Sequence, residues 1–240
     1  MSVRPRRVRA IYRKELRQYR RNRSLILGMA ILPLIFVANP LVTIFALPAS
    51  SASELRHVHV LLYLLGIPAI VPTVIAAYSV AGERQQGTLE PMLTTPIRRD
   101  EFLLGKALAV LAPSLAISYA VLAVVLACVE LFADPAVASA LLRGPELLGQ
   151  ALFTPLLAGW SIWIGMAIST RSSDVRVAQQ LGSPASLPSI AVATLIAYDV
   201  IHPTLGLALG LAAALLLGNG AGWRLTSAMF DRERLITGTK

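Results

Sequence analysis

ALAVLAPSLAISYAVLAVVLACV, residues 107–129, contains no charged side chain. About 20 apolar residues in a helix are enough to cross the ~30 Å hydrocarbon core of a bilayer. Working outward from this stretch, runs of similar length and character are found at residues 25–47, 58–82, 147–169, 177–201 and 203–223. The sequence therefore predicts an all-α integral membrane protein with six transmembrane helices.

The composition supports this prediction. The 240 residues are 55% hydrophobic and only 15% charged, whereas a soluble domain carries about 25% charged residues. A large soluble helical protein is disfavoured, because so many uncharged runs could not all be interior helices in a chain of this size. Cys128 lies inside an apolar run and predicts an inert buried thiol.

Basic residues alternate between the connections and predict the orientation. Of 22 Lys and Arg residues, all but Arg56 and Arg143 lie in residues 1–24, 83–106, 170–176 and 224–240. The positive-inside rule places these four segments, and hence both termini, in the cytoplasm. The net charge of +9 is concentrated before the first apolar run, which favours contact with membrane lipid over nucleic acid.

Residues 1–24 predict an amphipathic interfacial helix. Val8, Ile11, Tyr12, Leu16 and Tyr19 share one face, and arginines cover the other. The run that follows is longer than a signal-peptide core, so we expect a retained first span.

Glu15 falls on the apolar face of this helix and needs a buried partner. No residue three or four positions away is a cation. The candidates are therefore cations of the cytoplasmic loops: Arg98, Arg99, Lys106, Arg171 and Arg176. The alternative is a Glu15 side chain that bends to the rim, stays hydrated and bonds to Gln18.

The first cytoplasmic connection, residues 83–106, directly follows Gly82, and residues 82–106 read GERQQGTLEPMLTTPIRRDEFLLGK. Thr88 can cap a short helix, Pro91 is tolerated in a first turn and Pro96 would end it. Apolar side chains on a charged cytoplasmic helix indicate a docking surface for another protein.

The fifth run is the least apolar, and Pro184 and Pro188 in its first half predict kinks, which either are ordinary kinks tolerated in a span or mark a pathway. Polar side chains at membrane depth favour a wet cavity or a protein contact. The candidates for lining a pathway are Gln179, Gln180, Ser183, Ser186 and Ser189.

The sequence has no constellation typical of an enzyme. It has no phosphate-binding loop, no zinc motif and no serine nucleophile motif. His57, His59 and His202 are scattered near the predicted outer surface, which disfavours a metal site. Catalytic, cofactor and metal residues are therefore predicted to be absent, and carboxylates typical of a proton-driven carrier are missing from the spans.

The connection resembles the central signature of type-2 ABC exporter permeases. The matching positions are Glu83-Arg84-x-x-Gly87-Thr88-Leu89-Glu90, Leu93-x-Thr95-Pro96-Ile97-x-Arg99-x-Glu101 and Leu104-Gly105-Lys106. Pro91 and Met92 depart from the usual residues. Lys14-Glu15-Leu16 and Arg21-Asn22-Arg23 are similar to the interfacial helix of that family.

The resemblance implies a non-catalytic permease subunit that forms half of an export pathway. A second permease, identical or paralogous, would complete it. Two cytoplasmic ATPase subunits, holding ATP and magnesium, would bind a coupling helix in residues 83–106. It implies coupling roles for Glu83, Gly87, Thr88, Leu89, Glu90, Leu93 and Pro96.

The wider predictions are an efflux function in the plasma (inner) membrane of a bacterium. The cargo would be a drug, a lipid or another amphipathic molecule. The alternatives are a channel or ion-driven carrier, a membrane enzyme and a non-transporting assembly subunit.

Overall fold

The computed structural model describes residues 4–46, 58–88 and 97–229, which form helices and no strands. The helices are α1 (Pro5–Arg21), α2 (Arg23–Ala46), η2 (Val60–Leu65), α4 (Gly66–Gln85), α6 (Arg99–Phe132), α7 (Pro135–Leu141), α8 (Gly144–Arg171), α9 (Val175–Ala197) and α10 (Leu205–Met229). Six of these segments are long and apolar enough to cross a membrane. The predicted all-α membrane protein with six spans is confirmed.

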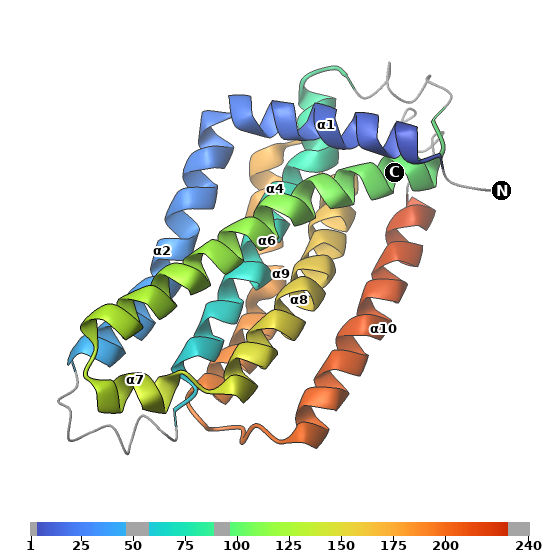
Figure 1. The fold of residues 1–240 in the computed structure, drawn as a ribbon. Helices are drawn as coiled ribbons and strands as arrows, with labels where there is room; N and C mark the ends of the chain where they lie inside the picture. The colour runs from blue at the N-terminus through green and yellow to red at the C-terminus, as the bar shows by residue number, and fades with distance from the viewer. Residues whose placement is uncertain (1–3, 47–57, 89–96, 230–240) are drawn as a thin grey trace.

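The helices are arranged as a bundle with a different short helix at each end (Figure 1). α1 lies across one end, here called the α1 end, and α7 lies at the other, the α7 end. α2 begins and α10 finishes at the α1 end. α4 ends and α6 begins at the same end, so the most basic segments of the described chain are gathered there.

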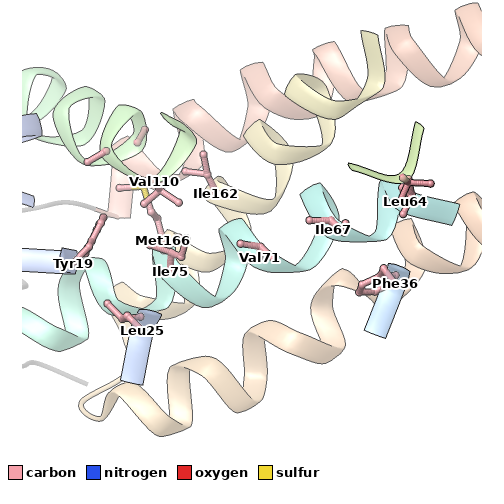
Figure 2. Close-up of a cluster of buried hydrophobic side chains, with 14 of the residues drawn as sticks. Tyr19, Leu25, Phe36, Leu64, Ile67, Val71, Ile75, Val110, Ile162 and Met166 are labelled. Carbon is pink, nitrogen blue, oxygen red and sulfur yellow. The ribbon is translucent and has the colours of Figure 1, made fainter. Parts of the chain in front are cut away.

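α4 is the central helix. In the most apolar part of the span Val60–Gln85, which η2 and α4 form together, 78% of the residues are buried, against 39% or less in the other spans. Ile67, Val71 and Ile75 lie along it and contact side chains from several neighbours (Figure 2). Because α4 is surrounded by protein, the remaining helices present most of the lipid-facing surface.

Small and hydroxyl side chains let α8 approach α4 closely. A side chain at Gly165 would come within 2.7 Å of the Thr73 carbonyl oxygen. Ser161 and Ser169 donate hydrogen bonds to the carbonyls of Ala69 and Ala77 on α4. Such contacts are typical of helices that associate in membranes, where small residues allow tight packing.

Pro184 and Pro188 lie inside α9, and Val175–Ala197 is one continuous helix. One local feature differs from the sequence-based predictions, because the helix α7 was not predicted. It begins with Pro135 after Asp134, whose carboxylate caps it by accepting a bond from the Ala136 amide.

Within the proline-containing turns of α9, the hydroxyls of Ser183 and Ser186 donate hydrogen bonds to carbonyls of the same helix. The boundaries of the spans differ from the predicted ones. α9 ends four residues before the expected limit of 201, and Asp199, just beyond it, has a left-handed conformation at φ 56°. Of the predicted connection 83–106, the first residues already belong to α4 and the last ones to α6.

Candidate functional site: a buried ion-pair cluster

A cluster of buried charges joins α1, α4 and α6 at the α1 end. Its members, here called the Lys106 cluster, are Lys14, Glu15, Glu83 and Lys106. The Lys106 side chain is 0% exposed. Its ammonium donates to Glu15 Oε1 at 2.9 Å, to Glu83 Oε1 at 2.8 Å and to the Ser79 carbonyl at 2.7 Å. An ammonium has three N–H donors, so each of them has an acceptor.

Lys14 completes the charge balance from the edge of the cluster. Its ammonium lies 3.0 Å from Glu15 Oε1 and 2.5 Å from Glu83 Oε1, and its side chain is 43% exposed. Two cations therefore face two carboxylates. Burial of charge in a low-dielectric site is tolerated when the charges are paired and hydrogen-bonded.

The pKa values in α1 follow from this arrangement. Burial alone would raise the pKa of Glu15, but the charges of Lys106 and then Lys14 outweigh it and lower the pKa. Burial would lower the pKa of Lys14, and the charges of Glu15 and Glu83 raise it instead. Burial, followed by the same two carboxylates, raises the pKa of Tyr19. The charged forms of Glu15 and Lys14 are therefore favoured by their contacts in the cluster, and the neutral form of the Tyr19 phenol is favoured beside them.

Close packing of α1 on α6 brings these charges together. Gly105 precedes Lys106, and a side chain there would come within 2.8 Å of Ile11 and 3.2 Å of the Val8 carbonyl. Phe102, one turn earlier, places its ring 4.9 Å from the Lys106 ammonium, a distance typical of a cation–π contact. The small residue Gly105 in the Leu-Gly-Lys segment therefore allows α1 to pack closely against α6.

Glu101 makes a second connection between α1 and α6. Its carboxylate is 0% exposed and accepts bonds from the Arg4 amide at 3.0 Å, the Arg98 amide at 3.2 Å and the Arg7 guanidinium at 3.3 Å. The bond from Arg98 is the return half of a helix-capping arrangement, which explains why an acid stands at the third position of α6. Glu101 belongs to the signature in the sequence, but no role was predicted for it.

α4 ends in a Schellman motif beside the cluster. Gly87 has φ 66° and donates its amide to the Arg84 carbonyl, while the Thr88 amide donates to the Glu83 carbonyl at 3.0 Å. A left-handed residue at this place is usually glycine. Gly87 and Thr88 therefore terminate α4, and the Thr88 hydroxyl also donates to the Glu83 carbonyl.

Arg84 ties the same end of α4 to α8. Its guanidinium donates to the carbonyl of Ser172 at 2.7 Å and of Thr170 at 3.3 Å. These carbonyls belong to the end of α8, where helices leave acceptors without intrahelical donors. The end of α4 is thus fixed to α1, α6 and α8 together.

The structure confirms the buried partner predicted for Glu15. Lys106 is one of the candidate cations, and Glu15 is 2% exposed, so the alternative of a hydrated side chain at the rim is wrong. Lys14 was missed as a partner because only positions three and four residues away were considered. Leu16, beside them, packs against the hydrophobic core.

Glu83 is 1% exposed and faces the two lysines. It is therefore held inside the protein rather than displayed at the surface. The other residues with expected coupling roles, Leu89, Glu90, Leu93 and Pro96, lie outside the described residues, as does the predicted coupling helix.

The polar residues of α9 are not part of the Lys106 cluster. Ser186 is 1% exposed, Gln179, Ser183 and Ser189 are half-buried, and Gln180 is exposed. Four of the five thus lie on or beside the face that packs against α4 and α8. Their expected role in a pathway stays a prediction.

The described residues hold no group of three or more His, Cys, Asp or Glu side chains suited to a metal ion. The characteristic feature of the α1 end is instead a network of ion pairs that joins α1, α4 and α6. The class of protein is thus an integral membrane protein with six apolar spans and a buried charged cluster beside the connection between α4 and α6.

The chain belongs to the ABC-2 family transporter proteins, whose family model matches residues 9–217. It is therefore a permease-type membrane subunit of an ABC transporter. The match includes α1 from Arg9 onward and nearly all of the six spans. A comparison with curated proteins gives no match.

Proposed function

We propose that this chain is the membrane subunit of an ATP-driven exporter and forms half of its translocation pathway. A second permease subunit completes the pathway, and separate ATPase subunits bind ATP and magnesium. The family supports the membrane subunit of an ABC transporter. The absence of a phosphate-binding loop from the sequence supports a separate ATPase.

The distribution of charge supports an orientation with the α1 end in the cytoplasm. α1 alone contains Arg and Lys at eight of its seventeen positions, and Arg84, Lys106 and Arg171 lie at the same end. Arg143, at the start of α8, lies at the α7 end. This asymmetry follows the positive-inside rule for a bacterial plasma membrane.

The Lys106 cluster is the observation that carries the coupling proposal. Glu83 lies near the end of α4 and Lys106 near the start of α6, so they flank the connection between these helices. Their side chains are in contact at 2.8 Å. Glu15 joins the same ammonium from α1. A displacement of the connection by a bound ATPase would therefore move α1, α4 and α6 as a unit, since a buried ion pair is costly to separate.

In this proposal the coupling residues have two different tasks. Leu89, Glu90, Leu93 and Pro96 would contact the ATPase, with Gly87 and Thr88 setting where α4 ends. Glu83, buried between lysines, would act by positioning the connection. The cargo would be an amphipathic drug, lipid or similar molecule, passing beside the polar side chains of α9.

The test is ATP-dependent export by membrane vesicles, with the tagged chain purified alongside its associated ATPase. We expect Leu89→Asp to abolish export and release an ATPase that carries a phosphate-binding loop, because the new charge would enter a desolvated contact. Thr204→Asp, at the start of α10 and exposed, is the matched control and should change neither. Export that needs an ion gradient but no ATP would overturn the proposal in favour of an ion-driven carrier.

A further inference from the structure

A second surface of α1 lies on the flank opposite Lys14. At ~100° per residue, Arg9 and Lys14 fall on opposite sides of the buried face of the helix. A groove opens on the Arg9 side between α1 and α6. Its lining residues are Pro5, Val8, Arg9, Tyr12, Leu104, Leu108, Leu111, Ala112 and Leu115.

The floor of this groove is a stripe of leucines on α6. Leu104, Leu108, Leu111 and Leu115 are spaced by four, three and four residues, which places them on one face of a helix. The stripe runs ~16 Å along α6, at ~1.5 Å per residue. It leads from the level of α1 into the apolar part of the span, and Leu108 is still 38% exposed.

The mouth of the groove is positively charged. Arg9 is exposed, and its guanidinium has neither a hydrogen bond nor an ion pair within the described part of the chain. Tyr12 lies beside it and is half-buried. A cation and an aromatic hydroxyl above an apolar channel match the level at which lipid headgroups meet acyl chains.

We propose that this groove is a binding site for one anionic phospholipid. Its phosphate would lie against Arg9, and one acyl chain would follow the leucine stripe. This inference rests on α6 being a membrane span and goes beyond the coupling proposal. A second copy of the chain seated symmetrically here would bring its own arginine-rich α1 against this one, and like charges would oppose it.

The role of the Arg9 charge in lipid binding is tested by native mass spectrometry of the detergent-purified chain. The probes are phosphatidylglycerol and phosphatidylethanolamine with identical acyl chains. We expect tighter binding of phosphatidylglycerol, and a loss of about fivefold of that preference in Arg9→Gln, since one basic residue near anionic lipid contributes ~1 kcal/mol. Arg17→Gln is the matched control, because Arg17 is also exposed on α1 but lies outside the groove.

The groove itself is tested by filling it. Leu108→Trp should weaken binding of both lipids several-fold, whereas Leu217→Trp, on an α10 position that is 75% exposed and remote from the groove, should not. Ala112→Leu replaces Leu108→Trp if the latter does not fold. Equal losses in Arg9→Gln and Arg17→Gln would show diffuse attraction only, and unchanged binding in the filled variants would show that no acyl chain lies there. Either result overturns the proposal, and neither bears on ATP-driven export.

Discussion

The two ends of the bundle hold buried carboxylates in different ways. At the α1 end, Lys106 is fully enclosed and contacts Glu15, Glu83 and a backbone carbonyl within 2.9 Å. At the α7 end, Glu146 is buried against His59 at 3.0 Å, while Arg143 lies 3.9 Å away. Two lysines thus face two carboxylates at the α1 end, whereas at the α7 end one carboxylate lies against a histidine ring.

The difference indicates which end holds its helices by charge. The Lys106 cluster joins three elements, and removing its central cation would leave two carboxylates buried. The α7 end joins η2 and α8 by a single carboxylate, supported by a neutral bond from Gln150 to the Leu61 carbonyl. We therefore expect charge-removing substitutions to have large effects at the α1 end and small ones at the α7 end.

The largest effect is expected for Lys106→Met, which keeps the apolar stem and removes the charge. Glu15 and Glu83 would lose their buried cation, and breaking one side of a buried pair costs ~3–5 kcal/mol. The measurement is thermal or denaturant unfolding of the protein in detergent. Lys14→Met is the control, because Lys14 is partly exposed and its loss should cost much less. Equal effects of the two substitutions would contradict the central place of Lys106.

A double-mutant cycle sharpens the same point. Glu15→Gln and Lys106→Met should be non-additive by more than ~0.5 kcal/mol, because the two side chains are in contact. Additive effects would mean that Glu15 contributes nothing through Lys106. The same cycle measured on export would test whether the pair takes part in coupling.

The second effect, in order of size, is expected for Gly105→Ala. The added methyl group would press on Ile11 and the Val8 backbone, and overpacking costs ~1–3 kcal/mol. α1 should be displaced from α6, with increased protease access to α1 as a second measurement. Gly144→Ala, at the α7 end, meets nothing within 4 Å and should be nearly neutral. An unchanged free energy of unfolding in Gly105→Ala would show that α1 can shift without loss of stability.

The spans could be predicted from the sequence because a bilayer requires long apolar helices, and that requirement is visible in composition alone. The partner of Glu15 could be narrowed to five cations because a carboxylate on an apolar face needs one. Lys106 could be identified among these five cations only from the close packing of α1 on Gly105, which is a tertiary contact. The same limit hid Glu101, whose partners are mostly backbone amides, and such bonds leave no signature in the sequence.

The features of α9 and α7 have physical reasons as well. The kinks expected at Pro184 and Pro188 are compatible with one continuous span, because in a membrane helix neighbouring helices and serine hydroxyls can compensate for lost backbone bonds. α7 is too short for a periodic pattern to reveal. The coupling role expected for Glu83 rests on its position in the signature and stays a prediction, whereas its burial could not be read from the sequence.

A smaller effect is expected for Glu146→Gln at the α7 end. The substitution removes the charge but keeps the size and a group that can bond to His59, so the loss should stay near ~1 kcal/mol, the net value of an ordinary hydrogen bond. The measurement is again unfolding in detergent, compared directly with Glu15→Gln. A loss at Glu146 as large as that of Lys106→Met would remove the contrast between the two ends.

The smallest effect near neutral pH, and the most specific, is the pH dependence of the α1 contact. The pKa of Glu15 is lowered in the folded protein, with Lys106 and Lys14 overcoming the opposing effect of burial. A carboxyl group with a lowered pKa stabilises the fold fully above its unfolded pKa, ~4.3, and this contribution is lost as the pH falls through the lowered value. The melting temperatures of wild type and Glu15→Gln should therefore differ by a constant amount at neutral pH and converge on acidification below that value. Lys14, whose pKa is raised, contributes stability that is lost only as the pH rises through its raised value, so it cannot produce the acidic convergence. A difference that stays constant down to pH ~3 would mean that Glu15 does not take up its proton on unfolding, and the ion pair with Lys106 would then need another explanation.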